Sequence, residues 1–265
     1  MMLTTPALDA AVRLVLSSER LIAFTGAGIS AESGIPTFRG KRGLWTERGT
    51  PPANRYRQFL EDSETFWHDE LTRALDPWVA GLRRALEQAR PNPAHVALAQ
   101  LESQGALRAV ITQNIDGLHQ AAGSREVVEV HGSRHKMRCV DCGARTPRVA
   151  LFLKSPPPPC AGCGGRVKFD SVLFGEPIPA DVLRRARGLV DEADCVLVVG
   201  TSSTVRPAGG FPRIAKANGA RLVEINTSET SLTRACDASL RGAAGDIVPR
   251  LVQAVRENVA RRSNS

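Results

Sequence analysis

Four of the six cysteines lie in two closely spaced pairs, Cys139 with Cys142 and Cys160 with Cys163. The resulting pattern, C-x2-C-x17-C-x2-C, has the spacing of a zinc site made of four thiolates. A glycine follows each pair, as a tight knuckle turn requires. Because four thiolates complete a tetrahedral shell, the pattern predicts a structural zinc ion with no open position for catalysis. Redox-active thiols are the alternative interpretation.

A glycine-rich turn follows the apolar run at residues 21–24 (LIAF), which is typical of a strand buried on both faces of a sheet. Gly26 and Gly28 can take positive φ and let a ligand approach the backbone. Together with Ala31 they form G-x-G-x-x-A, the pattern of a strand entering a helix above a dinucleotide pyrophosphate. Glycine turns between strands and helices are common, so a purely structural turn is the alternative.

The chain after this turn differs from a standard dinucleotide fingerprint, which leads directly into a crossover helix. It continues instead through residues 33–40 (SGIPTFRG), which include Pro36, Phe38 and Arg39. A proline, an aromatic ring and a cation suit a loop that folds over a bound ligand and excludes water.

His131 stands at the end of an apolar run, residues 127–130, and is followed by a glycine. Asn114 and Asp116 follow a second apolar run, residues 107–111. The carboxyl ends of parallel strands meet at one edge of a sheet, where such folds bind ligands. We therefore expect a base, an amide and a carboxylate to converge on one cleft. A lone histidine is more often structural, and that interpretation applies to His68, His95, His119 and His135.

The elements that must position these residues alternate between strands and helices. Helices are predicted over residues 7–20, 92–103, 211–218 and 246–258, and further strands over residues 195–199 and 222–225. This alternation predicts an α/β fold with a Rossmann-like, doubly wound parallel sheet. Two insertions interrupt it: a helical one at residues 41–90, and the cysteine-bearing one, in which Pro156 to Pro159 form an extended loop. The insertions should form a smaller second domain.

Composition limits the class of protein. The chain has 265 residues, 42% of them hydrophobic and 23% charged, as in an ordinary soluble globular protein. Six cysteines are too few for a disulfide scaffold, and neither a signal peptide nor an apolar run of about 20 residues is present. We therefore expect a cytoplasmic location and no membrane contact. The net charge of +8 comes from scattered arginines, which argues against a nucleic-acid footprint.

The motifs taken in order resemble the sirtuins, NAD-dependent protein-lysine deacylases, over nearly the whole chain. They are GAGIS, SGIPTFRG, QNIDGLH, HG, the two C-x2-C pairs, VLFGE, GTSSTVRPA, IN and RGAAGDIVP. The chain looks like a bacterial sirtuin. The resemblance implies a Rossmann-like NAD-binding domain made of residues 1–40, 91–131 and 171–260. It also implies a small domain made of a helical module (41–90) and a zinc-binding module (132–170), with a tail at 261–265.

The resemblance also implies roles for individual residues. The loop from Gly26 to Ser30 would hold the pyrophosphate, Asp116 would pair with the carboxamide of nicotinamide, and Asn226 would hold the adenosine ribose. In full, the expected NAD-binding residues are Gly26, Ala27, Gly28, Ile29, Ser30, Phe38, Arg39, Gln113, Asn114, Ile115, Asp116, Gly200, Thr201, Ser202, Asn226, Thr227, Ser228 and Ala244.

His131 and Asn114 are the catalytic residues that the resemblance implies. His131 would act as the general base that activates a ribose hydroxyl after the acyl oxygen has displaced nicotinamide. The acyl-lysine peptide would run as an added strand between two loops, which contribute Val172, Phe174, Gly175, Glu176 and Val205. The implied products are nicotinamide, the free lysine and an O-acyl-ADP-ribose.

Two segments depart from the family pattern. Residues 168–171 read KFDS, where the family usually has a basic residue, a proline, a polar residue and an aliphatic one. Members that remove acidic acyl groups carry a tyrosine and an arginine three residues apart, whereas this chain has Glu70 and Arg73. Arg73 therefore lacks its tyrosine, and Glu70 would repel a carboxylate. We expect a neutral acyl group, most simply acetyl.

Three other functions remain open at this point. A zinc ribbon on a basic protein could bind nucleic acid, although its loops lack interleaved aromatic residues. An NAD dehydrogenase would need no peptide groove. Transfer of ADP-ribose to protein could use the same site, and the fate of the adenosine half of NAD would distinguish it.

Overall fold

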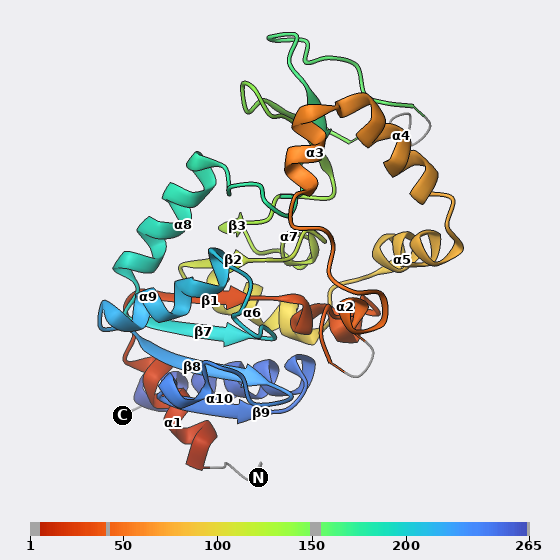
Figure 1. Ribbon diagram of the computed structural model, residues 1–265. Coiled ribbons are helices and arrows are strands. Elements are labelled where there is room, and N and C mark those ends of the chain that lie inside the picture. Colours follow the sequence, from red (N-terminus) through yellow and green to blue (C-terminus); the bar gives the residue numbers. More distant parts are fainter. Residues whose placement is uncertain (1–5, 41–42, 149–154, 264–265) are drawn as a thin grey trace.

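The computed structural model describes residues 6–40, 43–148 and 155–263, and its main feature is a six-stranded parallel sheet (Figure 1). All neighbouring strands in it pair in parallel. The strand order reverses beside β1, as in a doubly wound sheet, which confirms the predicted fold class. In spatial order the strands are β3 (Val127–Glu129), β2 (Ala109–Thr112), β1 (Leu21–Thr25), β7 (Cys195–Val199), β8 (Arg221–Asn226) and β9 (Ala238–Arg241).

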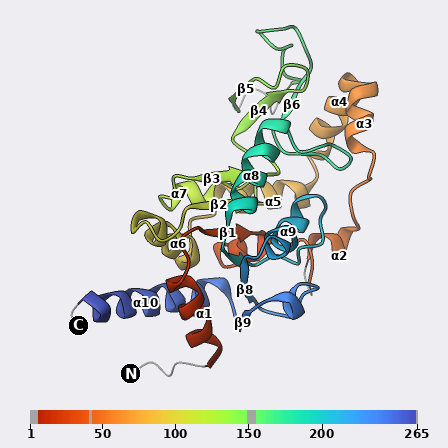
Figure 2. The same cartoon turned by 90° about the vertical axis from the view of Figure 1, so that its left-hand side faces the viewer.

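Helices cover both faces of this sheet (Figures 1 and 2). One face packs against α1 (Pro6–Leu16), α6 (Pro93–Ser103) and α10 (Ala244–Ser263). The other packs against α8 (Ala180–Glu192) and α9 (Phe211–Ala217). Successive side chains of a strand point to opposite faces, so β1 supplies Ala23 to the first core and Phe24 to the second. A strand buried on both faces needs the unbroken apolar run that its sequence has.

In the two insertions, residues 55–73 and the small antiparallel sheet pack together above the parallel sheet (Figure 2). The first forms α2 (Leu44–Arg48), α3 (Arg55–Glu61), α4 (Ser63–Arg73) and α5 (Pro77–Gln88). The second forms an antiparallel sheet in the order β5 (Arg145–Pro147), β4 (Lys136–Cys139) and β6 (Val167–Phe169).

These insertions share one apolar core. Phe59 and Phe66 of the helices pack in it with Met137 of β4. Trp67 also donates a hydrogen bond from Nε1 to the carbonyl of Val167, at 3.1 Å. The small sheet therefore depends on the helices for its apolar contacts.

Helix ends follow the capping residues in the sequence. Asp62 accepts a hydrogen bond from the backbone of Thr65 at the start of α4, and Asp76 does the same for α5, whose first residue is a proline. Asn92 caps α6. Short helical segments complete the fold: η1 (Ala27–Ser33), α7 (Leu118–Ala121), η3 (Ala208–Gly210) and η4 (Thr233–Ala235).

The structure differs from the sequence-based expectation in several places. The glycine turn enters a 3-10 helix, η1, and Gly26 has φ of −136°, so the positive φ expected there is wrong. The sequence analysis did not predict α8 and β9. The last helix continues to Ser263, into the predicted tail. Residues 149–154, part of the predicted zinc module, and 264–265 lie outside the described residues. Within the described ranges, we find no helix long and apolar enough to cross a membrane.

Candidate active site at the strand ends

His131 lies where the sequence predicts it, two residues after β3, and is held by the neighbouring strand end. Its Nδ1 is 3.0 Å from the carbonyl oxygen of Gln113, which follows β2. A carbonyl oxygen can only accept, so Nδ1 carries the proton. The second nitrogen, Nε2, then has a free lone pair in the neutral ring. Burial lowers the pKa of His131 below its usual 6.5, opposed by the Gln113 hydrogen bond, so the neutral form dominates at pH 7.

Asn114 and Asp116 converge with the glycine loop in a buried polar cluster. Ser30 donates to Asp116 Oδ2 at 2.7 Å, and Asn114 Nδ2 donates to Ser30 Oγ at 3.0 Å. Asn114 Nδ2 also reaches the carbonyl of Gly26, at 3.2 Å. The second oxygen of Asp116 accepts the backbone N–H of Leu118 at 2.9 Å. The cluster therefore fixes the amide and the carboxylate to η1 and to the start of α7.

Beside this cluster, the loop after β7 packs directly on the glycine turn. Gly28 donates its N–H to the carbonyl of Gly200 at 2.8 Å. A side chain at Gly28 would place its Cβ 2.7 Å from the Cα of Gly200. Gln113 donates to Thr201 Oγ1 at 2.8 Å and so joins this loop to the end of β2. Gly28 is thus required for the close packing of two loops rather than for an unusual φ.

Side chains that could hold a dinucleotide line the same edge. Asn226, at the end of β8, donates from Nδ2 to the carbonyl of Thr201 at 3.1 Å. Arg39 approaches Ser202 Oγ to 3.4 Å and lies 4.5 Å above the ring of Trp45. Phe38 is exposed, and its ring lies 4.9 Å from that of Trp45 between centroids. The exposed arginine provides a cation for phosphate groups.

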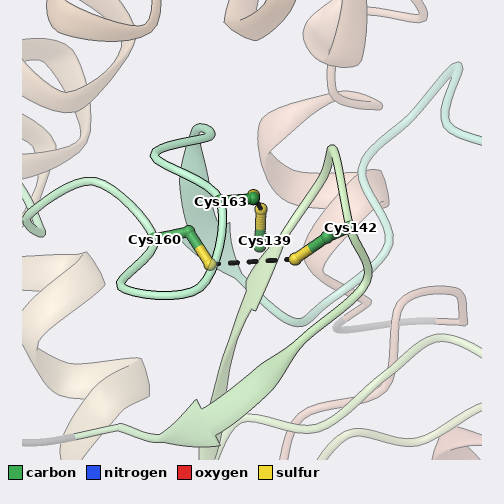
Figure 3. Close-up of side chains that lie close together, drawn as sticks. All are labelled: Cys139, Cys142, Cys160 and Cys163. Carbon is green, nitrogen blue, oxygen red and sulfur yellow. Dashed lines mark hydrogen bonds between the residues drawn. The ribbon is translucent and has the colours of Figure 1, made fainter.

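The four cysteines form a compact cluster at one end of the small sheet (Figure 3). All four sulfur atoms lie within 4.8 Å of one another. Cys139 and Cys163 are 3.6 Å apart between sulfurs, and Cys142 and Cys160 are 3.7 Å apart. A tetrahedral zinc ion with Zn–S distances of about 2.3 Å requires sulfur separations of about 3.8 Å. The cluster therefore fits a zinc ion held by four thiolates.

Comparison with known proteins identifies the family. Residues 26–207 match the sequence model of the Sir2 family. The NAD-dependent protein deacylase 2 of the archaeon Pyrobaculum aerophilum is 45% identical over 258 residues, which cover 94% of this chain and 96% of that protein. The chain belongs to the Sir2 family.

Solved Sir2 structures share the fold. A Sir2 homologue in complex with NAD has a TM-score of 0.75 and 41% identity, and the match covers 94% of each chain. A Sir2 variant with deacetylated p53 peptide and 3′-O-acetyl ADP ribose has a TM-score of 0.74 and 34% identity, covering 95% of this chain and 98% of that one. This Sir2 protein is an NAD-dependent protein deacylase.

The loop that follows the small sheet lies directly on the histidine of this Sir2 protein. Val172 donates its N–H to the carbonyl of His131 at 2.8 Å. Phe174 accepts the N–H of Tyr56 at 3.0 Å, which ties the loop to α3. Gly175 has φ of +84°, and its Cα passes so close to Ala53 that an added Cβ would lie 2.5 Å from the carbonyl oxygen. Val205 is partly buried in the loop after β7.

Several of the expected ligand-binding residues have buried side chains. Ile29 is fully buried in the core, and Ala244, the first residue of α10, is 5% exposed. Any contact that Ile29 makes with a ligand must come from its backbone. Glu176 is also buried, and its carboxylate pairs with Arg138 and Lys168. The remaining expected NAD residues, Ala27, Ile115, Thr227 and Ser228, keep partial or full exposure.

Several residues around the site were not found from the sequence. Ser203 has φ of +54°, and its buried hydroxyl has no partner among the described residues. Glu32 accepts the N–H of Gly245 at 2.6 Å and so joins η1 to the start of α10. His95 and His119 are buried and pack edge to face, with their ring centroids 4.9 Å apart. No local pattern marks these residues, because their partners lie far away in the sequence.

Proposed function

We propose that His131 is the general base of NAD-dependent deacylation in this protein. The observation that supports this most strongly is the hydrogen bond from His131 Nδ1 to the carbonyl of Gln113. It fixes the ring and leaves Nε2 as the proton acceptor, and burial keeps the ring neutral at pH 7. A base whose neutral form dominates at the working pH can take a proton from a hydroxyl group.

The polar edge described above fits NAD. When bound, NAD supplies an electrophilic anomeric carbon, a ribose hydroxyl group and nicotinamide as the leaving group. We assign the pyrophosphate to residues 26–30 together with Arg39, and the adenosine ribose to residues 226–228. Asn114 and Asp116 would orient the nicotinamide half, since both are already held by η1. The buried hydroxyl of Ser203, which has no hydrogen-bond partner among the described residues, is a further polar group of this edge.

The substrate in this proposal is an acyl-lysine peptide that runs between residues 172–176 and Val205. The bond between Val172 and the carbonyl of His131 supports it, because a peptide strand on this loop would bring its lysine close to the base. The predictions of no membrane partner and no nucleic-acid partner stand unchanged.

We further propose that the acyl group is neutral. Glu70 Oε1 is 2.7 Å from Arg55 and 3.0 Å from Arg73, so the carboxylate holds both arginines within the helical module. The only tyrosine, Tyr56, has its pKa raised by burial and then by the charge of Glu176, which places it beside the buried acid rather than beside Arg73. Pairing with two arginines weakens the expected repulsion by Glu70. Arg73, paired with Glu70 and without a tyrosine three residues before it, is therefore poorly placed to bind an acidic acyl group.

The experiment compares kcat/KM on acetyl-lysine and succinyl-lysine peptides of identical sequence. We expect the acetyl peptide to be preferred, and Glu70→Gln to raise activity on the succinyl peptide by releasing Arg73. Arg57→Gln is the control, because Arg57 pairs with Glu61 on the exposed side of α3. A succinyl preference of tenfold or more, about 1.4 kcal/mol, would contradict a neutral acyl group.

Three finer points stay predictions. We propose that NAD binding and peptide binding divide between the two domains. The NAD-binding domain consists of residues 1–40, 91–131 and 171–260, and the small domain consists of residues 41–90 and 132–170. A cytoplasmic location is proposed because a four-thiolate site suits a reducing compartment. The bacterial origin that the motifs suggested has no support from the relative described above, which is archaeal.

A further inference from the structure

Four charged side chains lie buried where the small sheet meets the loop of residues 171–175. They are Arg138 on β4, Lys168 on β6, Asp170 and Glu176, with side chains exposed by 7%, 1%, 4% and 2%. We call them the buried charge cluster. Lys168 Nζ is 2.9 Å from Glu176 Oε2, and Arg138 Nε is 3.0 Å from Asp170 Oδ1. Arg138 also pairs with Glu176. A less buried arginine, Arg145 on β5, also lies 3.1 Å from Asp170 Oδ1.

The cluster forms hydrogen bonds with the backbone in the first half of this loop and just before it. Lys168 Nζ donates to the carbonyl of Ser171 at 2.7 Å and to that of Phe169 at 2.8 Å. Glu176 Oε2 accepts the N–H of Leu173 at 2.8 Å. Between these anchors, Val172 donates to the carbonyl of His131 at 2.8 Å. The loop and the backbone of the histidine are therefore fixed together.

A second contact joins the cluster to the histidine loop. Asp170 Oδ2 accepts the N–H of Ser133 at 3.0 Å, two residues after His131. Gly132 packs so closely that an added Cβ would lie 2.1 Å from the carbonyl of Asp170. Any shift of Asp170 would therefore displace the histidine loop.

Stability alone does not account for these charges. Burying paired ions costs desolvation that an apolar cluster of similar volume would avoid. The cost is visible at Lys168, where burial lowers the pKa to about 8 against the opposing charge of Glu176. An apolar neighbour, Phe169, packs 4.7 Å from Trp67 in the shared core, so apolar side chains are accommodated close by. The charges instead provide directional bonds to four backbone groups.

We propose that Lys168 and Glu176 are positioning residues, which hold residues 171–175 and the His131 backbone in the geometry that receives the acyl-lysine peptide. Neither side chain touches the substrate in this account. The inference rests on the proposed peptide groove. It predicts that loss of the pair weakens peptide binding while NAD binding, which uses the ends of β1, β7 and β8, is unchanged.

The test uses Lys168→Met, which keeps the length of the side chain and removes its charge. Lys216→Met is the matched control, because Lys216, near the end of α9, forms a partly buried 2.6 Å pair with Asp237, away from the loop. Both are measured with the zinc-loaded protein for peptide KM, kcat, NAD Kd and hydrogen exchange at the Val172 and Leu173 amides. If Lys168→Met does not fold, Glu176→Gln replaces it, since the amide keeps an acceptor for Leu173.

We expect Lys168→Met to raise the peptide KM. Hydrogen exchange at the Val172 and Leu173 amides should become at least tenfold faster. Its NAD Kd should stay within twofold, and Lys216→Met should change none of these. Unchanged amide exchange, or equal weakening of NAD and peptide, would overturn the positioning role. Faster exchange with an unchanged peptide KM would support the positioning of the loop and contradict the proposed peptide groove instead.

Discussion

At the scale of single residues, the account depends on one nitrogen atom of His131. Replacing His131 with alanine should lower kcat by about 100- to 10,000-fold, the usual contribution of a general base. NAD Kd should change little, because among the described residues the ring is held by a hydrogen bond to the backbone of Gln113, which alanine at position 131 leaves in place. The matched control is His68→Ala, an exposed histidine on α4. Weakened NAD binding with normal turnover at saturation would assign His131 to binding.

The pH profile gives an independent test of the same residue. Burial lowers the pKa of His131, so its neutral, proton-accepting form should persist below pH 6.5. The acid limb of kcat/KM, which reports the free enzyme, should therefore lie below pH 6.5. If the acid limb lies above pH 6.5 and is still present in His131→Ala, a group other than His131 titrates.

Residues at strand ends were predictable, whereas buried charges were not. His131, Asn114 and Asp116 each follow an apolar run, so their common edge follows from the rules of parallel sheets. Lys168 and Glu224 look like ordinary surface residues in the sequence. Glu224 is fully buried on β8 and pairs with Arg241 at 2.9 Å, a partner that only the fold brings near.

At the scale of elements, the four-cysteine cluster joins the end of β4 to the loop before β6, and the small sheet shares its apolar core with the helices. The shared core has Met137 and Phe59 in contact, so loss of the metal should loosen α3 and α4 as well as β4 to β6. Cys142→Ala should release zinc, lower the melting temperature and reduce activity. Cys236→Ala is the control, since Cys236 lies outside the cluster and contacts Leu232. A metal-free preparation with unchanged melting temperature and activity would contradict a structural role.

Elements with continuous or alternating apolar patterns were predicted well, and those with polar surfaces were missed. The strands β1 and β7 are buried along their whole length, so their sequences carry no polar residue except Thr25 at one end. Helix α8 fully buries only Ala186 and Val190, and its other positions are largely charged. The packing of η1 against Gly200 joins residues far apart in the sequence, so no local pattern encodes it.

At the scale of the whole molecule, two buried histidines should make the fold sensitive to acid. Burial lowers the pKa of His95 to about 4, opposed by Asp116, and that of His119 to about 3, with His95 adding to the effect. Below pH 6.5 both histidines bind protons in the unfolded chain, whereas in the folded chain they stay neutral until the pH approaches their lowered pKa values. The free energy of unfolding therefore falls as the pH falls. Two such groups give a loss of up to about 2.7 kcal/mol per pH unit.

Urea unfolding of zinc-loaded protein between pH 7 and pH 5 checks this slope. His119→Gln removes one titrating group and should reduce the slope by up to about 1.4 kcal/mol per pH unit, whatever its effect on absolute stability. A free energy of unfolding that stays constant from pH 6.5 to pH 5 would show that these rings are protonated in the folded protein.

The central claim is that an acyl group leaves lysine for ADP-ribose at the edge where His131, the glycine loop and residues 171–175 meet. The most direct measurement is mass spectrometry of the products formed from NAD and an acetyl-lysine peptide. We predict nicotinamide, unmodified lysine peptide and O-acetyl-ADP-ribose in equal amounts, all reduced together in His131→Ala. Free acetate formed without NAD consumption, or ADP-ribose attached to protein, would contradict the account.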